Sequence, residues 1–184
     1  MAKTSSNMLA LGTDAPLFSL PDVISATSIS LKADPTCKAT VIAFICNHCP
    51  YVKHINHELV QLAHDYIKQG VRFYAINSND ILQYPDDAPE QMKQVALTEG
   101  YPFPYLFDES QDVAKAYQAA CTPDFYLFNA QLKLVYRGQL DDARPGNDVP
   151  VNGASLRHAL DDVLQNKLVS GVQKPSLGCN IKWK

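Results

Sequence analysis

The chain has 184 residues, which is enough for one domain with a sizeable core and too few for two average domains. Hydrophobic residues make up 46% and charged residues 19%, which excludes disordered, collagen-like and coiled-coil proteins. The net charge of −3 provides no cationic excess for nucleic acid or an anionic membrane, so neither is an expected partner. No stretch reads as a signal peptide or a transmembrane helix, and we therefore expect a cytoplasmic protein.

Predicted strands and helices alternate along most of the chain. The continuous apolar run 39–46 predicts a strand buried on both faces of a sheet, and 71–77 predicts a second strand. Between them, the spacing of apolar residues predicts a helix from the second cysteine of Cys46-Asn-His-Cys49 to Gly70. The remaining predicted elements are helices over 88–98, 112–120 and 155–168, a short strand over 105–108, and an antiparallel hairpin over 125–129 and 133–138. This order predicts an α/β fold with a mixed sheet and helices on both faces.

Cys46 and Cys49 carry the clearest chemical signal in the sequence. A Cys-x-x-Cys motif at a strand-to-helix junction places the first sulfur near unpaired amide N–H groups, where the helix dipole favours negative charge. Cysteines at such positions have pKa values of roughly 3.5 to 7.5, against about 8.5 for a free thiol. We therefore expect Cys46 to face solvent as a thiolate and to attack a substrate. Cys49, one turn further and more enclosed, is expected to resolve the mixed disulfide.

Two other interpretations of this pair are open. His54 and His57 would complete a set of zinc ligands with the cysteines, but one continuous helix does not easily fold four such residues around one ion. The cysteines could instead be inert structural thiols. We expect neither a metal nor another cofactor.

Asn47 and His48 separate the two cysteines. A polar, partly cationic side chain at position 48 would stabilise a nearby thiolate and make the disulfide more oxidising. The alternative is a solvated loop histidine. Further along the chain, the Thr122-Pro123 bond could be cis, although the local pattern alone favours trans.

Three segments together resemble the thioredoxin-like proteins of the alkyl hydroperoxide reductase and thiol-specific antioxidant superfamily. They are Phe44-Ile-Cys-Asn-His-Cys-Pro-Tyr-Val-Lys53, Cys121-Thr-Pro-Asp-Phe-Tyr-Leu127 and Gly178-Cys-Asn-Ile-Lys-Trp-Lys184. Gly12-Thr-Asp-Ala-Pro-Leu-Phe18, with Leu20-Pro-Asp22, is similar to the N-terminal extension of that superfamily.

The resemblance implies one thioredoxin-like domain over 1–184, a three-layer α/β/α mixed sheet with an N-terminal β-hairpin and a central insertion. It implies that Cys46 and Cys49 are the redox pair, that Pro123 is cis, and that Thr122 presents its backbone to a bound extended peptide. Such an enzyme exchanges disulfides with protein thiols or disulfides. It also needs an electron donor or acceptor, which the sequence does not identify.

The chain departs from ordinary thioredoxins around the cysteines. Ile45 stands where they have Trp, and Asn47-His48 replaces their Gly-Pro. Thr40 stands in place of their buried aspartate, so the base that deprotonates Cys49 is not identified. The Asn-His pair is nearer in type to disulfide oxidases and isomerases, which also carry His before the second cysteine.

Two alternatives to a thiol–disulfide oxidoreductase are weighed. Peroxiredoxins have a Thr three residues and a Pro seven residues before the attacking cysteine. Ala43 and Ala39 occupy those positions here, which disfavours a peroxidase, although peroxide oxidises a reactive thiolate to some degree. A non-catalytic binding module with this fold would not need both cysteines.

Three further cysteines lie outside the motif. Cys121 precedes Pro123 by two residues, so we expect its sulfur near the redox pair. Cys179 lies close to Trp183, the only tryptophan, and because a free polar tail has little use for an indole, we expect residues 169–184 to dock on the domain. Cys121 and Cys179 either form a second redox relay or are small buried hydrophobes. Burial is preferred because free cysteine is among the most buried residue types, and Cys37 is taken as inert.

Overall fold

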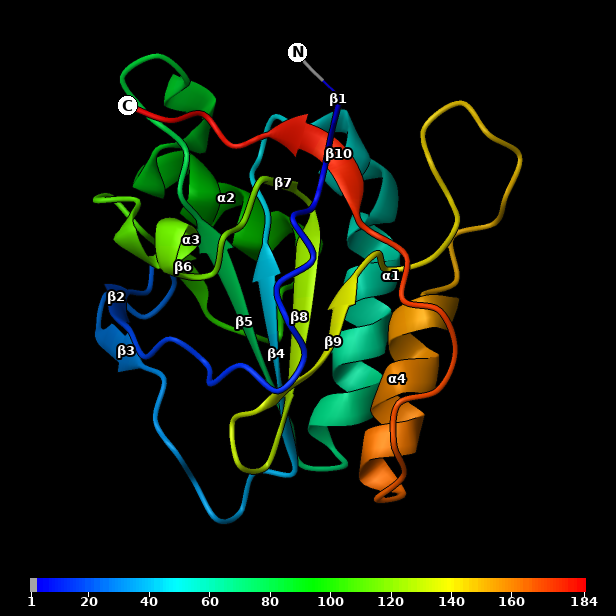
Figure 1. Cartoon of the computed structure of the whole chain (residues 1–184). Coiled ribbons are helices and arrows are strands. Elements are labelled where there is room, and N and C mark those ends of the chain that lie inside the picture. Colours follow the sequence, from blue (N-terminus) through cyan, green and yellow to red (C-terminus); the bar gives the residue numbers. More distant parts are fainter. Residues whose placement is uncertain (1–2) are drawn as a thin grey trace.

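A five-stranded mixed sheet forms the centre of the protein, which a computed structural model describes over residues 3–184 (Figure 1). Its strands are β4 (Ala39–Phe44), β5 (Val71–Asn77), β6 (Tyr105–Phe107), β8 (Asp124–Asn129) and β9 (Leu134–Gly138). The strand order is β6-β5-β4-β8-β9, with β4, β5 and β6 parallel and β8 antiparallel to both of its neighbours. Every residue of β4 is buried, so the prediction of a central strand buried on both faces is confirmed.

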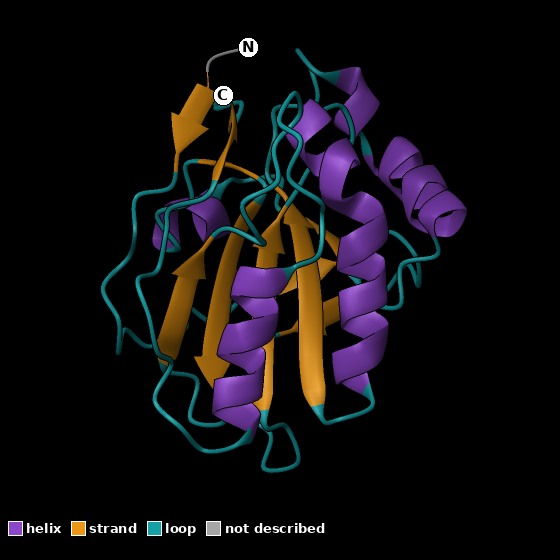
Figure 2. Cartoon of the chain, turned by 90° about the vertical axis from the view of Figure 1, so that its right-hand side faces the viewer, coloured by secondary structure: helices purple, strands orange, loops and turns teal. Residues whose placement is uncertain are grey.

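In the described part of the chain, three helices cover one face of this sheet (Figure 2). They are α1 (Pro50–Ile67), α2 (Pro89–Glu99) and α4 (Ala154–Leu164). Val41 and Ala43 of β4 belong to the core beneath them, because alternate side chains of a strand point to the same face. This layer places the start of α1 directly above the end of β4.

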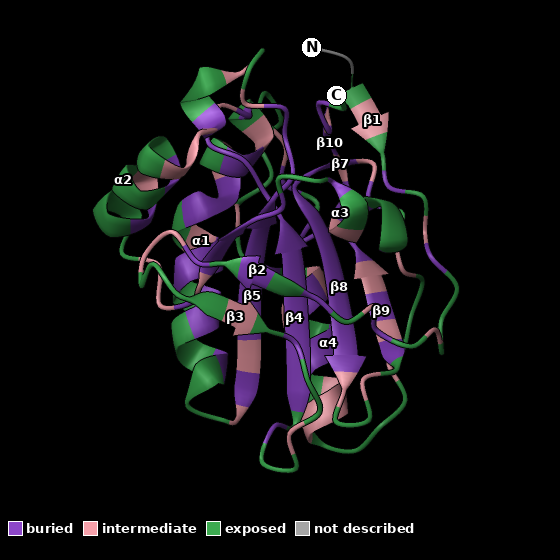
Figure 3. Ribbon diagram, turned by 90° about the vertical axis from the view of Figure 1, so that its left-hand side faces the viewer, coloured by how far each residue is buried: buried purple, intermediate pink, exposed green. Residues whose placement is uncertain are grey.

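The other face is covered by the N-terminal part of the chain and by the short helix α3 (Asp112–Ala116) (Figure 3). β2 (Ser19–Pro21) and β3 (Ser28–Ser30) form the antiparallel hairpin expected of the N-terminal extension. Phe44 of β4 points into this second core, where its ring centroid lies 5.5 Å from that of Tyr117. A mixed sheet with helical elements on both faces is therefore confirmed, with the N-terminal segment supplying most of this second layer.

A second, smaller sheet joins the two ends of the chain to the middle. Its strand order is β1 (Lys3–Ser5), β10 (Leu177–Asn180) and β7 (Cys121–Thr122), and both pairings are antiparallel. β10 lies beside β1, near the start of α1 (Figure 1). The sequence did not predict these strands, because two to four residues are too few for a periodic pattern.

Two predicted helices are shorter than expected. α3 ends at Ala116 and α4 at Leu164, whereas the predictions ran to 120 and 168. Gln118 and Asn166 have φ values of 51° and 55°, and such left-handed residues cannot continue a right-handed helix. No helix within residues 3–184 is both long and apolar enough to cross a membrane.

The C-terminal segment docks through β10 and the residue that follows it. Cys179 and Ile181 are buried, and the backbone N of Ile181 donates to the O of Ala120 at 3.1 Å. Trp183, in contrast, is 41% exposed. Backbone pairing and small side chains therefore anchor the segment, and the indole is only partly covered.

Candidate functional site

The two motif cysteines lie where β4 gives way to α1. β4 ends at Phe44, and α1 begins at Pro50 with Cys49 as its N-cap residue. Proline suits the first helical position, because its missing N–H is one that the helix could not bond. The junction is the predicted one, but with free thiols Cys46 is only 1% exposed and Cys49 is fully buried. The expectation that Cys46 faces solvent is therefore wrong for the dithiol.

The two thiols interact directly, and this interaction controls their ionisation. A hydrogen bond from Cys46, with a smaller contribution from the thiol of Cys179, lowers the pKa of Cys49 below its usual range, although burial opposes both. The same hydrogen bond raises the pKa of Cys46, and burial and the charge of Asp87 raise it more. Both shifts run against the expected thiolate at Cys46 and favour a charge on Cys49 in the dithiol.

Asp87 is a buried carboxylate directly beside the motif. It is the last residue of the 3-10 helix η1 (Pro85–Asp87), which follows β5 in the chain. It accepts hydrogen bonds from the backbone N of Asn47 at 2.7 Å, Nδ1 of His48 at 2.6 Å and Nδ2 of Asn79 at 2.7 Å. Burial alone would raise the pKa of this carboxyl, but these donors lower it below its usual range. Asp87 is therefore negatively charged at neutral pH.

Asn47 and His48 bind Asp87 rather than a cysteine sulfur. The Sγ of Cys46, one ring nitrogen of His48 and one carboxylate oxygen of Asp87 nevertheless lie within 4.8 Å of one another. The His48 ring stacks on Tyr84, with centroids 5.2 Å apart and an interplanar angle of 14°. Its side chain is 13% exposed, so the structure does not place it as a solvated loop residue. His48 therefore binds the carboxylate of Asp87, which neighbours Cys46.

These three side chains are also the group within residues 3–184 whose ligand atoms lie close enough to hold a metal ion. Cys49, His54 and His57 do not belong to it, so the structure does not assemble the four-residue zinc site considered from the sequence. His48 and Asp87 already bond each other at 2.6 Å. This contact favours a hydrogen-bonded network over a metal centre.

The Thr122–Pro123 bond is cis, as the resemblance implies and against the general preference for trans. The Oγ1 of Thr122 lies 3.3 Å from the Sγ of Cys46. Its carbonyl O lies 3.2 Å from the Sγ of Cys49, from which it accepts a hydrogen bond whenever that thiol is protonated. Thr122 therefore contacts both sulfur atoms. Its backbone, however, pairs with Cys179, so the chain's own strand β10 occupies the edge that was expected to bind an extended peptide.

The remaining cysteines differ in how they relate to this pair. The Sγ of Cys179 lies 3.0 Å from the Sγ of Cys49. Cys121 is also buried, but its Sγ contacts the carbonyl O of Pro123 at 3.6 Å, and burial raises the pKa of its thiol. The Sγ of Cys37 contacts the backbone of β4. Cys179 is therefore the third cysteine that meets the redox pair, and its sulfur partner is Cys49.

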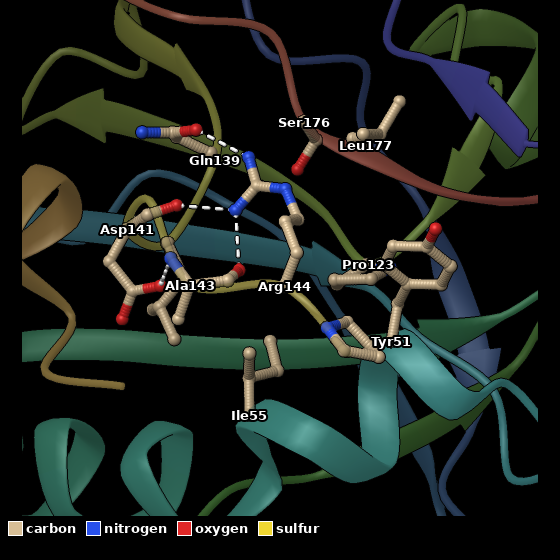
Figure 4. Close-up of a pocket in the computed structure, with 11 residues that line it drawn as sticks. Tyr51, Ile55, Pro123, Gln139, Asp141, Ala143, Arg144, Ser176 and Leu177 are labelled. Carbon is tan, nitrogen blue, oxygen red and sulfur yellow. Dashed lines mark hydrogen bonds between the residues drawn. The ribbon is translucent and has the colours of Figure 1, made fainter. Parts of the chain in front are cut away.

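A small pocket opens beside the cis bond (Figure 4). Tyr51, Pro123 and Leu177 line it together with Arg144. The guanidinium of Arg144 donates to Oε1 of Gln139 at 2.5 Å and to two backbone carbonyls of its own loop. Because these bonds hold the guanidinium in place, Arg144 forms a wall of the pocket and is not a free cation.

Sequence reasoning missed Asp87, although a topological signal was available. The carboxyl ends of neighbouring parallel strands meet at one edge of a sheet. β4 leads into the cysteine motif, and its parallel neighbour β5 leads into Asn77-Ser-Asn-Asp80 and then Asp87. A search of the segment after 71–77 for an acidic partner of the motif would have found it.

Two solved structures are similar to this chain over nearly their whole length. An uncharacterized conserved protein from Geobacillus kaustophilus is 60% identical, with a TM-score of 0.98, and the match covers 100% of this chain and 97% of that one. A hypothetical protein from Sinorhizobium meliloti 1021 is 49% identical, with a TM-score of 0.95 and 98% coverage of both chains. Neither description names an activity, so these two similarities indicate no function.

A third similarity concerns the fold alone. The thioredoxin domain of a thiol-disulfide oxidoreductase from Bacteroides vulgatus is 19% identical, with a TM-score of 0.61, over 81% of this chain and 97% of that one. The fold is thus thioredoxin-like.

A comparison with curated proteins gave no match. The model of the AhpC/TSA family matches residues 11–137. Since this match spans more than half of the sequence and includes the cysteine motif, the chain belongs to the AhpC/TSA family.

Proposed function

We propose that this protein is a thiol–disulfide oxidoreductase that exchanges disulfides with protein substrates through Cys46 and Cys49. One observation carries the proposal. The two thiols share a proton at the start of α1, and the residue before a cis proline contacts both sulfur atoms. Inert structural thiols need no such mutual interaction.

The reaction begins with a proton moving within the pair. When the shared proton passes from Cys46 to Cys49, Cys46 becomes the thiolate and attacks one sulfur of a substrate disulfide. The first substrate thiolate leaves, and a mixed disulfide joins Cys46 to the other. Cys49 then loses its proton and attacks Cys46, which forms the Cys46–Cys49 disulfide and releases the second substrate thiolate. The shared proton of the pair ends on one substrate thiolate, and the other takes its proton from solvent.

Asp87 acts on this cycle as a fixed negative charge. It disfavours a second negative charge on Cys46, so it keeps the proton on that thiol until a substrate is present. The same repulsion favours the Cys46–Cys49 disulfide, because neither sulfur carries a charge in it. Asp87 is thus a positioning residue whose charge favours the oxidised pair.

Access to the pair limits the substrate. Both sulfur atoms are buried, and β10 pairs with Thr122. A protein substrate that binds as an extended strand must therefore displace part of β10 or approach from the side of His48, whose side chain is 13% exposed. Segments with little bulk around the disulfide fit this restriction better than folded domains.

Reduction of insulin disulfides with dithiothreitol as electron donor tests the proposal. The wild type should accelerate the reaction, and Cys46→Ser should show only the uncatalysed rate. Cys37→Ser is the matched control, because Cys37 is also buried but contacts only the strand backbone and a nearby hydroxyl. Turnover of hydrogen peroxide is measured in parallel. If the wild type consumes peroxide faster than it reduces disulfide, the protein is a peroxidase and the proposal is wrong.

A further inference from the structure

Cys49 is the middle of three sulfur atoms. Its Sγ receives a hydrogen bond from Cys46 on one side and lies 3.0 Å from the Sγ of Cys179 on the other. A disulfide bond is about 2.05 Å long, so a shift of roughly 1 Å would bring Cys49 and Cys179 to bonding distance. Two free thiols that are merely buried side by side have no need of this approach.

The backbone of β10 is built to hold Cys179 at this position. Gly178 packs so closely on the strand before the cis proline that a Cβ there would lie 2.0 Å from the carbonyl O of Thr122. Only glycine allows β10 to come this near. The next residue, Cys179, pairs with Thr122 on one side and with Lys3 on the other. The contact between the two sulfur atoms therefore follows from a close strand pairing.

The residues after β10 are fixed as well. Buried polar groups bind the backbone of Lys182: its N donates to Oδ1 of Asn79, and its O accepts from the N of Asp80 and from Nε2 of Gln111. The last two donors and Asn79 are themselves almost fully buried. The C-terminal segment is thus held on both sides of Cys179, and its sulfur cannot drift away from Cys49.

We infer that Cys179 is a third redox-active cysteine and that Cys49 forms its disulfide alternately with Cys46 and with Cys179. In the exchange, the thiolate of Cys179 attacks the Sγ of Cys49 in the Cys46–Cys49 disulfide. The Cys49–Cys179 bond forms, the Cys46–Cys49 bond breaks, and Cys46 leaves as a thiolate that takes up the proton lost by Cys179. The number of disulfides and thiols is unchanged, so no external oxidant or reductant takes part.

The consequence is a movable disulfide. With the bond between Cys49 and Cys179, Cys46 is a free thiol in an oxidised protein and can attack a second substrate. The relay rests on the proposed function, since the substrate disulfide supplies the first oxidation. Cys121 stays outside the relay, because its sulfur contacts a backbone carbonyl.

Serine variants test the relay in the full-length chain. Cys46→Ser is incubated with oxidised glutathione, quenched with acid, alkylated under denaturing conditions and mapped by mass spectrometry. We expect a Cys49–Cys179 disulfide in Cys46→Ser and in the matched control Cys46→Ser/Cys121→Ser, and none in Cys46→Ser/Cys179→Ser. If Cys46→Ser contains no disulfide between Cys49 and Cys179, the relay is overturned.

A second measurement uses the oxidised wild type, so that it does not depend on removing Cys46. After the same quench, at least about a tenth of the oxidised molecules should carry alkylated Cys46 and a Cys49–Cys179 bond, which allows a difference of about 1.4 kcal/mol between the two disulfides. Oxidised Cys179→Ser should carry no alkylated Cys46. Equal protection of Cys46 in both proteins would contradict the relay while leaving the Cys46–Cys49 pair intact. Absence of any disulfide at Cys46 in both would instead contradict the proposed function.

Discussion

Asp87 and Asp124 are both fully buried near the cysteines, yet their carboxyl groups are affected in opposite ways. Asp87 lies beside Cys46, where three donors lower its pKa below the usual range despite burial. Asp124 lies beside Cys121, where burial raises its pKa to about 8. The hydroxyl of Tyr126 donates to its Oδ2 at 3.1 Å, and its Oδ1 finds no hydrogen-bond partner among the described residues.

The difference shows that burial alone does not determine the charge of a carboxyl group in this site. The balance between burial and the surrounding groups decides it: at Asp87 the donors and the charge of His48 outweigh burial, whereas at Asp124 burial outweighs the donors. The side of the site that holds Cys46 therefore carries a fixed negative charge. The carboxyl of Asp124, on the side that holds Cys121, is neutral below about pH 8. Four substitutions test this contrast.

Asp87→Ala should have the largest effect. It leaves three buried donors from Asn47, His48 and Asn79 without an acceptor, so we expect a loss of about 3 kcal/mol or more in the free energy of unfolding by urea. Asp87→Asn keeps one acceptor oxygen and should lose less. Asp112→Ala, at an exposed position, is the control. A loss below about 1 kcal/mol in Asp87→Ala would show that the hydrogen bonds to Asp87 do not stabilise the fold.

Asp124→Asn should change how stability depends on pH. The unfolded carboxyl releases its proton near pH 3.8, whereas the folded one keeps it until about pH 8, so the folded state binds more protons between these values. The wild type should therefore lose stability as pH rises through this window, by at most about 1.4 kcal/mol per pH unit. The variant should lack this slope and be the more stable protein at pH 8. Parallel pH profiles for the two proteins would mean that Asp124 is ionised in the fold.

Gly178→Ala should loosen the C-terminal strand, at a cost of about 1 to 3 kcal/mol in stability. Because the new Cβ would clash with the carbonyl of Thr122, β10 must move away, and Cys49 should react faster with iodoacetamide. Gly171→Ala is the control, since nothing lies within 4 Å of a Cβ at that position. It should lose only the backbone preference of glycine, about 1 kcal/mol, with Cys49 alkylation unchanged. Equal alkylation rates in both variants would show that β10 does not shield the pair.

His48→Phe should have the smallest effect. The ring can still stack on Tyr84, but Asp87 loses a donor that holds its pKa low. A carboxyl with a lowered pKa stabilises the fold above its unfolded pKa, and this contribution is lost as pH falls through the folded value. The acid limb of the stability profile should therefore move to higher pH by an amount worth about 1 kcal/mol, with His57→Phe on the exposed face of α1 as control. An unmoved acid limb would remove His48 from the Asp87 network.

The sequence predicted what depends on local pattern. The apolar run of β4 and the helical spacing after Cys49 fixed the junction that carries the motif, and the family resemblance implied the cis bond at Pro123. It did not predict contacts between distant residues. Asp87 meets the motif from 40 residues away, and Cys179 meets Cys49 from 130 residues away.

The direct contact between the two thiols, together with these distant groups, explains why the pKa shifts run against the expected thiolate at Cys46. The helix dipole favours the first sulfur of the motif, and this local argument would suffice for an isolated strand and helix. In the folded chain, Asp87 opposes a charge on Cys46, and Cys179 supports one on Cys49. The contact between the two thiols and burial contribute most to raising the pKa of Cys46, and Asp87 adds to them.

The most direct test of the redox pair is a titration of Cys179→Ser, which removes the competing sulfur, in buffers of reduced and oxidised dithiothreitol. After acid quench and alkylation, the masses of the protein and its peptides report which thiols are free at each ratio. We predict one two-electron transition, with about 30 mV for each tenfold change in the ratio, and a Cys46–Cys49 disulfide at its oxidising end. If Cys46 and Cys49 are both fully alkylated even in the most oxidising buffer, they are not a redox pair, and the account of this site is wrong.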